Sequence, residues 1–474
     1  MHDHLPLSTL YETSLHYLMT IGTKNTKFWL SYSCLFTLLI TLSATSVFSV
    51  FTKYTPWLLQ FFALALVVVV APSIKYKAIY LNKGFLISLY LSLFIILQIS
   101  INYFVFGFEI DYLIYLSYLF RILLAILFSI LLLNNPKIYF LRSLVIVSVF
   151  YTCHALLGAL LSIFINPTIL NVTNVEGAGL TMYSHIGYIF YYSQVLHIDL
   201  LDLNIYRQHG MHWEPGVFQF YPNVLIFAAL SGFYSGKKKM LLVLLGSIGV
   251  ILSTSSTGLM IMFVLVIMYF MRRHGKSFLS VSNAIKFGVI ILLFLPLIYI
   301  FIINKLSFDS PSALSFVMRI VDFESPITTA LRYPFFGIGN NPDAATSAGL
   351  QSHVLDFLSD TYSSPLISYY ESVVDSDNLL FRTSNGLFSV LMQYGFIYFA
   401  VYLVGIYRFS VRFGGLMFFV LCLGMLLNEP VAFSTLFTIF SIVGIMLDKN
   451  TMYNVAHQRF NNDYSSQKTN CAVS

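Results

Sequence analysis

Charged residues are scarce in this chain of 474 residues. Aspartate, glutamate, lysine and arginine make up 10% of the sequence, whereas 58% of the residues are hydrophobic. A soluble domain usually carries about 25% charged residues, because water must solvate the surface that covers its core. The composition therefore excludes a soluble globular enzyme, a disordered protein and a nucleic-acid-binding protein. It also argues against a porin-type barrel, whose strands alternate polar and apolar residues.

Cysteine is also rare, with four residues in the whole chain. Three of them fall inside apolar runs and the fourth lies near the C-terminus, and none has the spacing of a metal-binding motif. They are Cys34, Cys153, Cys422 and Cys471. We therefore expect neither a structural metal site nor a disulfide framework.

What the chain does contain is long apolar runs, and a membrane-spanning helix needs about 20 such residues. Runs of this kind are 28–50, 56–72, 84–105, 111–133, 143–165, 214–235, 284–303 and 384–407. Two longer blocks, 240–271 and 413–447, have basic residues at both ends and a polar break inside. Because basic clusters stay on the cytoplasmic side, each block should cross the membrane twice. The sequence predicts an all-α, polytopic transmembrane helical bundle with about twelve spans.

The distribution of charge orients this bundle. With both termini in the cytoplasm, that side holds most of the 26 lysine and arginine residues, and the acidic residues concentrate on the other side. The predicted order is a cytoplasmic segment (1–27), five spans (28–165), an external loop (166–213), four spans (214–303), a second external loop (304–383), three spans (384–447) and a cytoplasmic tail (448–474). The basic net charge thus reflects topology rather than a nucleic-acid surface.

The two large external loops hold most of the polar residues. In the first, we expect the tyrosine-rich stretch from Ile186 to Leu200 to lie along the membrane interface. The second should fold as an external lid, because structureless loops longer than about 15 residues are uncommon. Within the spans, Arg121 and His154 are ionisable, which favours a functional role. A structural role for both remains the alternative.

The most informative segment precedes the sixth span. Pro215 suits the first turn of a helix, which places Glu214 at about the N-cap and Arg207 shortly before it. Glu214 has two interpretations. It either caps the positive helix end or presents a carboxylate at the membrane surface that could act as a general base.

The spacing Arg207-x-x-Gly210-x-x-x-Glu214-Pro-Gly-x-Phe218 resembles the signature of bacterial O-antigen and exopolysaccharide polymerases (Wzy-type), which form a superfamily with the O-antigen ligases. Three further elements follow in the family's order. They are Leu252–Leu259, Pro334–Gly339 and Ser384–Gly395. The resemblance covers about residues 200–405 and implies a GT-C-like membrane glycosyltransferase architecture.

Two positions depart from the family pattern. Ser256 stands where many relatives carry arginine, which puts an anionic contact there in doubt. Ser384 stands where ligases commonly carry histidine before Asn385, which favours a polymerase over a ligase.

The resemblance implies an enzyme of the bacterial inner membrane that joins oligosaccharide repeat units carried on polyprenyl (undecaprenyl) pyrophosphate, at the periplasmic face. The lipid-linked oligosaccharide serves as donor and acceptor, membrane lipids surround the enzyme, and a chain-length regulator protein and a flippase are candidate partners. The resemblance implies no cofactor and no metal. Asp375 and Asp377 match the D-x-D metal pattern of soluble sugar-nucleotide transferases, but those enzymes have a different fold and a cytoplasmic donor.

This chemistry needs cations for the leaving pyrophosphate and a base for the acceptor hydroxyl. Guanidinium groups bind such oxygens in bidentate fashion. The candidate catalytic residues are Glu214, Arg207 and His353. The candidate substrate-binding residues are Arg319, Arg332, Arg382, Arg121, His212 and His209. The alternative for each arginine is an ordinary salt bridge.

Three other functions remain open. An O-antigen ligase would move the chain to lipid A core. A twelve-span flippase or transporter would place polar residues near the bilayer midplane, whereas this chain keeps them mostly in external loops. A non-catalytic scaffold of an export complex is the third.

Overall fold

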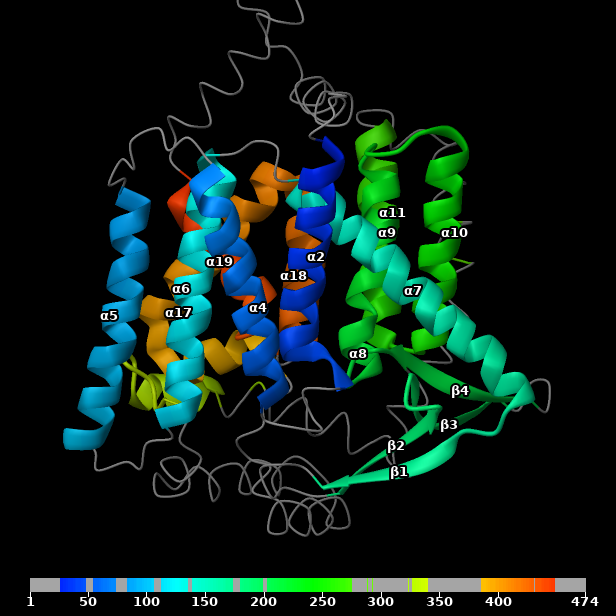
Figure 1. Cartoon of the computed structure of the whole chain (residues 1–474), viewed down its shortest axis with the longest axis horizontal. Coiled ribbons are helices and arrows are strands. Elements are labelled where there is room, and N and C mark those ends of the chain that lie inside the picture. Colours follow the sequence, from blue (N-terminus) through cyan, green and yellow to red (C-terminus); the bar gives the residue numbers. More distant parts are fainter. Residues whose placement is uncertain are drawn as a thin grey trace, which may run out of the picture.

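Helices from both halves of the sequence stand side by side in one bundle (Figure 1). The computed structural model describes residues 26–47, 54–73, 83–105, 112–134, 139–173, 180–198, 203–274, 326–339, 385–429 and 431–447, together with 288, 292 and 323. The N-terminal helices are α2 (Thr26–Thr45), α4 (Tyr54–Val70) with the short 3-10 helix η1 (Ala71–Ser73), α5 (Lys83–Phe104), α6 (Tyr112–Asn134) and α7 (Phe140–Phe164). The C-terminal helices are α8 (Pro215–Phe218), α9 (Phe220–Leu230), α10 (Gly236–Ser253), α11 (Ser256–His274), α17 (Gly386–Phe413), α18 (Gly415–Asn428) and α19 (Thr435–Met446).

These helices agree with the predicted membrane bundle. In the part of the chain that the structure describes, five helices are long and apolar enough to cross a membrane. The block 240–271 divides into α10 and α11 at Thr254, whose φ of 45° ends the first helix. The block 413–447 divides into α18 and α19 after Asn428, where Glu429 has an extended backbone with a φ of −136°. The predicted span 284–303 lies outside the described residues, apart from residues 288 and 292.

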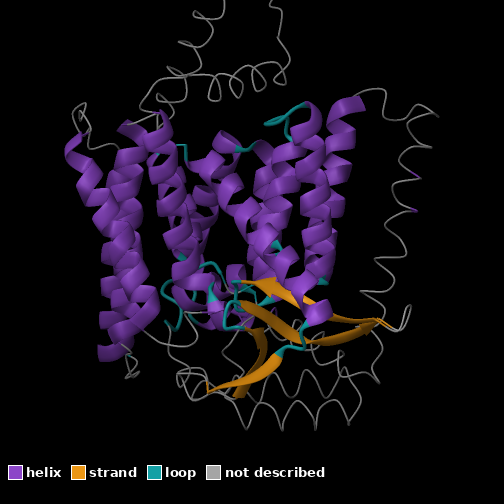
Figure 2. Cartoon of the chain, turned by 45° about the vertical axis from the view of Figure 1, so that its right-hand side comes forward, coloured by secondary structure: helices purple, strands orange, loops and turns teal. Residues whose placement is uncertain are grey.

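A four-stranded antiparallel sheet lies at one end of the bundle, which we call the sheet end (Figure 2). Its strands follow one another in space in the order of the sequence. They are β1 (Thr168–Thr173), β2 (Leu180–Ile186), β3 (Phe190–Ile198) and β4 (Leu203–Gly210). Most of residues 186–200 form strand β3, and the position of this stretch along the membrane interface stays a prediction. The positive φ of Gly187 and Tyr188 closes the β2–β3 hairpin and makes this pairing possible.

Helix α17 is interrupted at Gly395, and the element Pro334–Gly339 pairs with the interruption. The amide of Ile338 donates to the carbonyl oxygen of Met392 at 3.1 Å, and the amide of Phe396 donates to that of Pro334 at 2.8 Å. We call this pairing the α17 clamp. The element that was identified in the sequence as part of an external loop is thus hydrogen-bonded directly to a helix of the bundle.

Helix α5 supports the α17 clamp from the other side. The side-chain amide of Gln98 donates to the carbonyl oxygens of Phe336 and Gln393. These two carbonyls belong to the two partners of the clamp, so one glutamine satisfies a backbone group on each. Gln98 is fully buried, which makes this a structural use of a polar residue inside an apolar helix.

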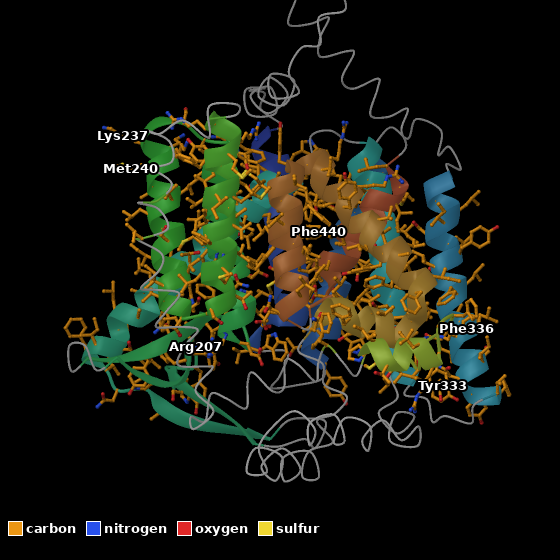
Figure 3. The ribbon with its side chains drawn as sticks, turned by 180° about the vertical axis from the view of Figure 1, so that it is seen from behind. Arg207, Lys237, Met240, Tyr333, Phe336 and Phe440 are labelled. Carbon is orange, nitrogen blue, oxygen red and sulfur yellow. The ribbon has the colours of Figure 1, made fainter. Side chains whose placement is uncertain are left out.

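The centre of the bundle is packed with aromatic rings. Phe440 of α19 lies there (Figure 3), and its ring stacks on that of Phe409 with centroids 4.4 Å apart. Phe418 of α18 meets the edge of Phe440 at 5.7 Å. Because interiors of this kind are close-packed, the three C-terminal helices form one rigid unit that carries the clamp.

The substitution Gly395→Ala should destabilise the protein by about 3 kcal/mol or more. Gly395 has a φ of 73°, and an added Cβ would lie 2.6 Å from the carbonyl oxygen of Pro334, so left-handed strain and a backbone clash add together. Thermal unfolding of the purified protein in detergent measures the effect.

Gly232→Ala is the matched control for this prediction. Gly232 has a φ of 86° with no atom within 4 Å of an added Cβ, so only the strain of about 1–2 kcal/mol applies. Equal losses of stability in the two variants would contradict the clamp.

Candidate functional site

Glu214 lies at the N-terminus of α8, where the chain passes from the sheet into the bundle. It is the N-cap residue, with φ −140° and ψ 148°, and Pro215 occupies the first helical turn as the sequence predicted. The Glu214 side chain makes no capping hydrogen bond, and the residue is exposed. Of the two interpretations that the sequence allowed, the structure therefore does not use Glu214 as a side-chain cap.

Arg207 lies on β4 and reaches the end of a different helix. Its Nε donates to the carbonyl oxygen of Ser253, the last residue of α10, at 2.9 Å. This contact places a cation at the negative end of the α10 dipole. It also joins two elements that were identified separately in the sequence, the Arg–Glu-Pro-Gly element and the Leu252–Leu259 element. Arg207 is half-buried, so its orientation is fixed while part of its surface stays accessible.

The turn between α10 and α11 is stabilised by its own serines. The Ser255 amide donates to Ser253 Oγ at 3.3 Å, and the Gly258 amide donates to Ser255 Oγ at 3.3 Å. Both interactions satisfy backbone N–H groups near the start of α11. The second serine therefore acts as a local cap, and the polar residues that predicted a turn here also build it.

A buried amide pair connects this turn to α9. Asn223 Nδ2 donates to the carbonyl oxygen of Gly258 at 3.1 Å and to Gln219 Oε1 at 2.9 Å. A Cβ on Gly258 would lie 2.9 Å from the Cβ of Gln219, so the glycine allows the two helices to approach closely. These contacts hold α8 and α9 rigidly against the α10–α11 turn.

Glu429 is a second carboxylate of this site, and the sequence analysis missed it. It is 4% exposed, and its carboxylate fills the space beside Gly216, where an added Cβ would lie 1.7 Å from Oε1. Its carbonyl oxygen accepts the Gly386 amide at 3.1 Å. Glu429 therefore contacts the Glu-Pro-Gly element with its side chain and the start of α17 with its backbone.

A signal for Glu429 was present in the sequence. It is an acid within the apolar block 413–447, and intramembrane ionisable residues indicate functional sites. Asn428-Glu429-Pro430 was interpreted only as the break between two helices. That interpretation was correct for the backbone, but it left the carboxylate without a role.

His209 and His212 are fully buried in the packing between the sheet and the bundle. The His212 ring packs against those of Tyr151 and Tyr221, with centroids 4.6 and 4.5 Å away. Burial lowers the pKa of His209 to about 4, and the nearby Arg207 adds to this effect. At neutral pH His209 is therefore an uncharged ring that helps to hold β4.

The two ionisable residues that were expected inside spans have different surroundings. Arg121 of α6 donates from Nη1 to the carbonyl oxygen of Phe433 at 2.6 Å, in the linker that also carries Glu429. The His154 ring stacks on Phe190 of β3, with centroids 4.7 Å apart. His154 thus packs the sheet against α7, whereas Arg121 supports the linker between α18 and α19.

Arg207 and Arg332, two described members of the predicted set of arginines, do not lie together. Arg332 is exposed and directly precedes Tyr333, and Figure 3 shows Tyr333 and Arg207 at opposite sides of the sheet end. Lys237 lies at the other end of the bundle from both (Figure 3). Arg319, Arg382 and His353 lie outside the described residues.

The described residues contain no group of three or more histidine, cysteine, aspartate or glutamate side chains that could hold a metal ion. The site consists instead of a guanidinium, two carboxylates and buried amides. Such groups can bind an anion, orient a hydroxyl and accept its proton.

Comparison with known proteins gives one family match. Residues 241–403 match a family model described as O-antigen ligase. No curated protein matches the chain. The matched segment contains the α10–α11 turn, the element Pro334–Gly339 and the start of α17, which are three of the four elements identified in the sequence. This match over residues 241–403 supports membership of the O-antigen ligase and polymerase superfamily.

Proposed function

We propose that this protein polymerises oligosaccharide repeat units linked to polyprenyl pyrophosphate, at the periplasmic face of the bacterial inner membrane. The sheet end would face the periplasm, with both termini in the cytoplasm. The observation that supports this most strongly is the joining of separate elements at one site. Arg207 contacts the end of α10, and the Glu429 carboxylate fills the space beside Gly216, directly after Glu214 and Pro215.

The reaction transfers a glycosyl group between two lipid-linked substrates. The bond between the anomeric carbon of the donor and its pyrophosphate oxygen breaks, and an acceptor hydroxyl oxygen bonds to that carbon. The hydroxyl proton passes to a base, and free polyprenyl pyrophosphate leaves. Charge therefore develops at the pyrophosphate, where a fixed cation is most effective.

Arg207 is the proposed cation for the leaving pyrophosphate. A guanidinium stays charged at any physiological pH and presents several N–H groups in a fixed plane. The hydrogen bond from Nε to the Ser253 carbonyl oxygen sets the orientation of that plane. The guanidinium would therefore lose little conformational freedom when the pyrophosphate binds. Arg319, Arg332, Arg382, Arg121 and His353 remain candidates for other contacts with the lipid-linked substrates.

The two glutamates have environments that suit different tasks. Glu214 is exposed at the start of α8 and is the proposed base for the acceptor hydroxyl. Glu429 is buried against Gly216 and is proposed to position the Glu-Pro-Gly turn. Two carboxylates in different surroundings can take separate roles in one reaction.

An O-antigen ligase is the second candidate function, because the matching family model carries that description. The two functions differ in the acceptor. A ligase transfers the glycan to lipid A core, whereas a polymerase transfers it to another lipid-linked repeat unit. A flippase would supply the substrate for either reaction, and a chain-length regulator would act on the polymerase.

Glu214→Gln and Arg207→Gln should each lower the rate of glycan lengthening by about 100-fold or more. The first removes the proposed base, whose contribution is typically 10²–10⁴-fold, and the second removes the cation. The assay combines purified protein in detergent with defined lipid-linked repeat units and resolves product length on gels.

Arg273→Gln is the matched control for the loss of a basic side chain. Arg273 is an exposed residue of α11 whose Nη1 donates to Tyr269 Oη at 3.1 Å. This variant should keep wild-type activity. Full activity of both site variants would refute the catalytic roles. Transfer only to lipid A core would identify a ligase, and absence of any transfer by the wild-type protein would exclude both enzymes.

Gly216→Ala should also abolish most lengthening, because its Cβ would occupy the place of the Glu429 carboxylate. Glu429→Asp retracts the carboxylate by one methylene, so the double variant Gly216→Ala/Glu429→Asp should recover part of the lost activity. A double-mutant cycle on rate and unfolding temperature measures this coupling. Additive losses in the two variants would show that the carboxylate does not act through Gly216.

A further inference from the structure

A second group of polar side chains lies at the sheet end, beside the α17 clamp. Asn102 is near the end of α5 and Tyr115 is near the start of α6. Both meet Gly339, since an added Cβ there would lie 2.0 Å from Tyr115 Oη and 2.8 Å from Asn102 Nδ2. Phe336 of the same clamp and Arg207 lie at opposite sides of the bundle (Figure 3). The three amide side chains beside the clamp are Gln98, Asn102 and Gln393, and we call them the amide cluster. The amide cluster is separate from the site around Glu214.

The amide cluster contains buried polar atoms that lack hydrogen-bond partners among the described residues. Asn102 is 2% exposed, and neither its Oδ1 nor its Nδ2 is paired. The Oε1 atoms of Gln98 and Gln393 are also buried and unpaired. Buried polar atoms in native proteins nearly always have a partner, and an exception indicates a role or a bound molecule. Four such atoms beside one clamp suggest a binding site.

The chemistry of these atoms indicates which ligand could form hydrogen bonds with them. Three of the four are amide carbonyl oxygens, which accept hydrogen bonds, and the fourth is an amide donor. The cluster has no carboxylate of the kind that calcium sites normally contain, and amide oxygens do not attract an anion. The best complement is therefore an uncharged ligand rich in hydroxyl groups.

Aromatic rings beside the cluster extend this complementarity. The ring of Phe94 stacks on Phe336 with centroids 5.4 Å apart and lies 5.9 Å from that of Tyr398. A sugar ring has hydroxyl groups at its edge and an apolar C–H face, so it needs both amide oxygens and aromatic surface. Helices α5 and α17 supply the amide oxygens, and α5, α17 and the clamp supply the aromatic surface.

We propose that the amide cluster is a subsite for a neutral sugar residue of the repeat unit. The proposal rests on the proposed function and adds the chemical class that one part of the enzyme recognises. Because the cluster lies across the bundle from Arg207, it binds a sugar remote from the reacting pyrophosphate. It therefore contributes to the choice of repeat unit and to affinity rather than to bond breaking.

Asn102→Leu tests the subsite, because leucine has the shape of asparagine without its polar atoms. Removing an unpaired buried group does not lower stability, so the unfolding temperature without glycan should be unchanged or higher. The probe is the lipid-free repeat-unit oligosaccharide, released by mild acid from the host's surface polysaccharide. It should raise the unfolding temperature of the wild-type protein, and the variant should bind it about fivefold or more weakly, as expected for lost neutral hydrogen bonds.

Gln60→Met is the matched control. Gln60 of α4 is also fully buried with both side-chain polar atoms unpaired among the described residues, but it is not part of the cluster. This variant should keep the wild-type response to the oligosaccharide. Gln393→Met removes a second unpaired oxygen of the cluster and gives the same test if Asn102→Leu does not fold.

Wild-type binding in both cluster variants would overturn the subsite, as would equal weakening in the Gln60 variant or no response of the wild-type protein. The measurement needs no lipid pyrophosphate and no transfer. Failure of the polymerase function would therefore appear in the lengthening assay alone, while failure of the subsite would appear in oligosaccharide binding.

Discussion

The linker between α18 and α19 holds the sheet end of this protein together. Three donors from distant parts of the sequence reach its carbonyl oxygens: the amide of Gly386, the hydroxyl of Tyr402 and the guanidinium of Arg121. A linker inside an apolar bundle cannot rely on water for its backbone groups, so each unpaired carbonyl would be costly. These contacts connect α6 and both the start and the middle of α17 to one short segment.

The Glu429 side chain extends from this linker toward Gly216 in α8. Burying one ionised carboxylate costs on the order of several kcal/mol even after the surrounding protein relaxes. The chain has only 20 acidic residues. Gly216 leaves the room that the carboxylate occupies. A carboxyl group buried against the element that carries Glu214 connects the packing of the bundle to the chemistry proposed for its surface.

Much of the fold could be predicted because the membrane imposes simple rules. Basic residues at both ends of 240–271 required two crossings, and the structure has α10 and α11 there. The sheet was not predicted, because the tyrosine-rich stretch was interpreted from its composition, and composition does not reveal the turn at Gly187 that pairs β2 with β3. Alternating patterns are weak evidence when the strands are short.

The site was predicted in part, and for a physical reason. Glu214 and Arg207 lie seven positions apart in the sequence, so a local pattern could find them. The contact of Glu429 with Gly216 joins residues far apart in the chain, and the opposite positions of Arg207 and the segment after Arg332 depend on how the helices pack. Sequence order carries little information about either.

The central claim is that the pyrophosphate of the donor binds at Arg207 while the amide cluster lies across the bundle. An electron cryomicroscopy structure of the Glu214→Gln protein with a bound lipid-linked repeat unit tests it most directly. We expect the pyrophosphate within hydrogen-bonding distance of the Arg207 guanidinium, with Nε still bound to Ser253. A pyrophosphate bound beside Arg332 and the α17 clamp instead, with no ligand at Arg207, would contradict the account.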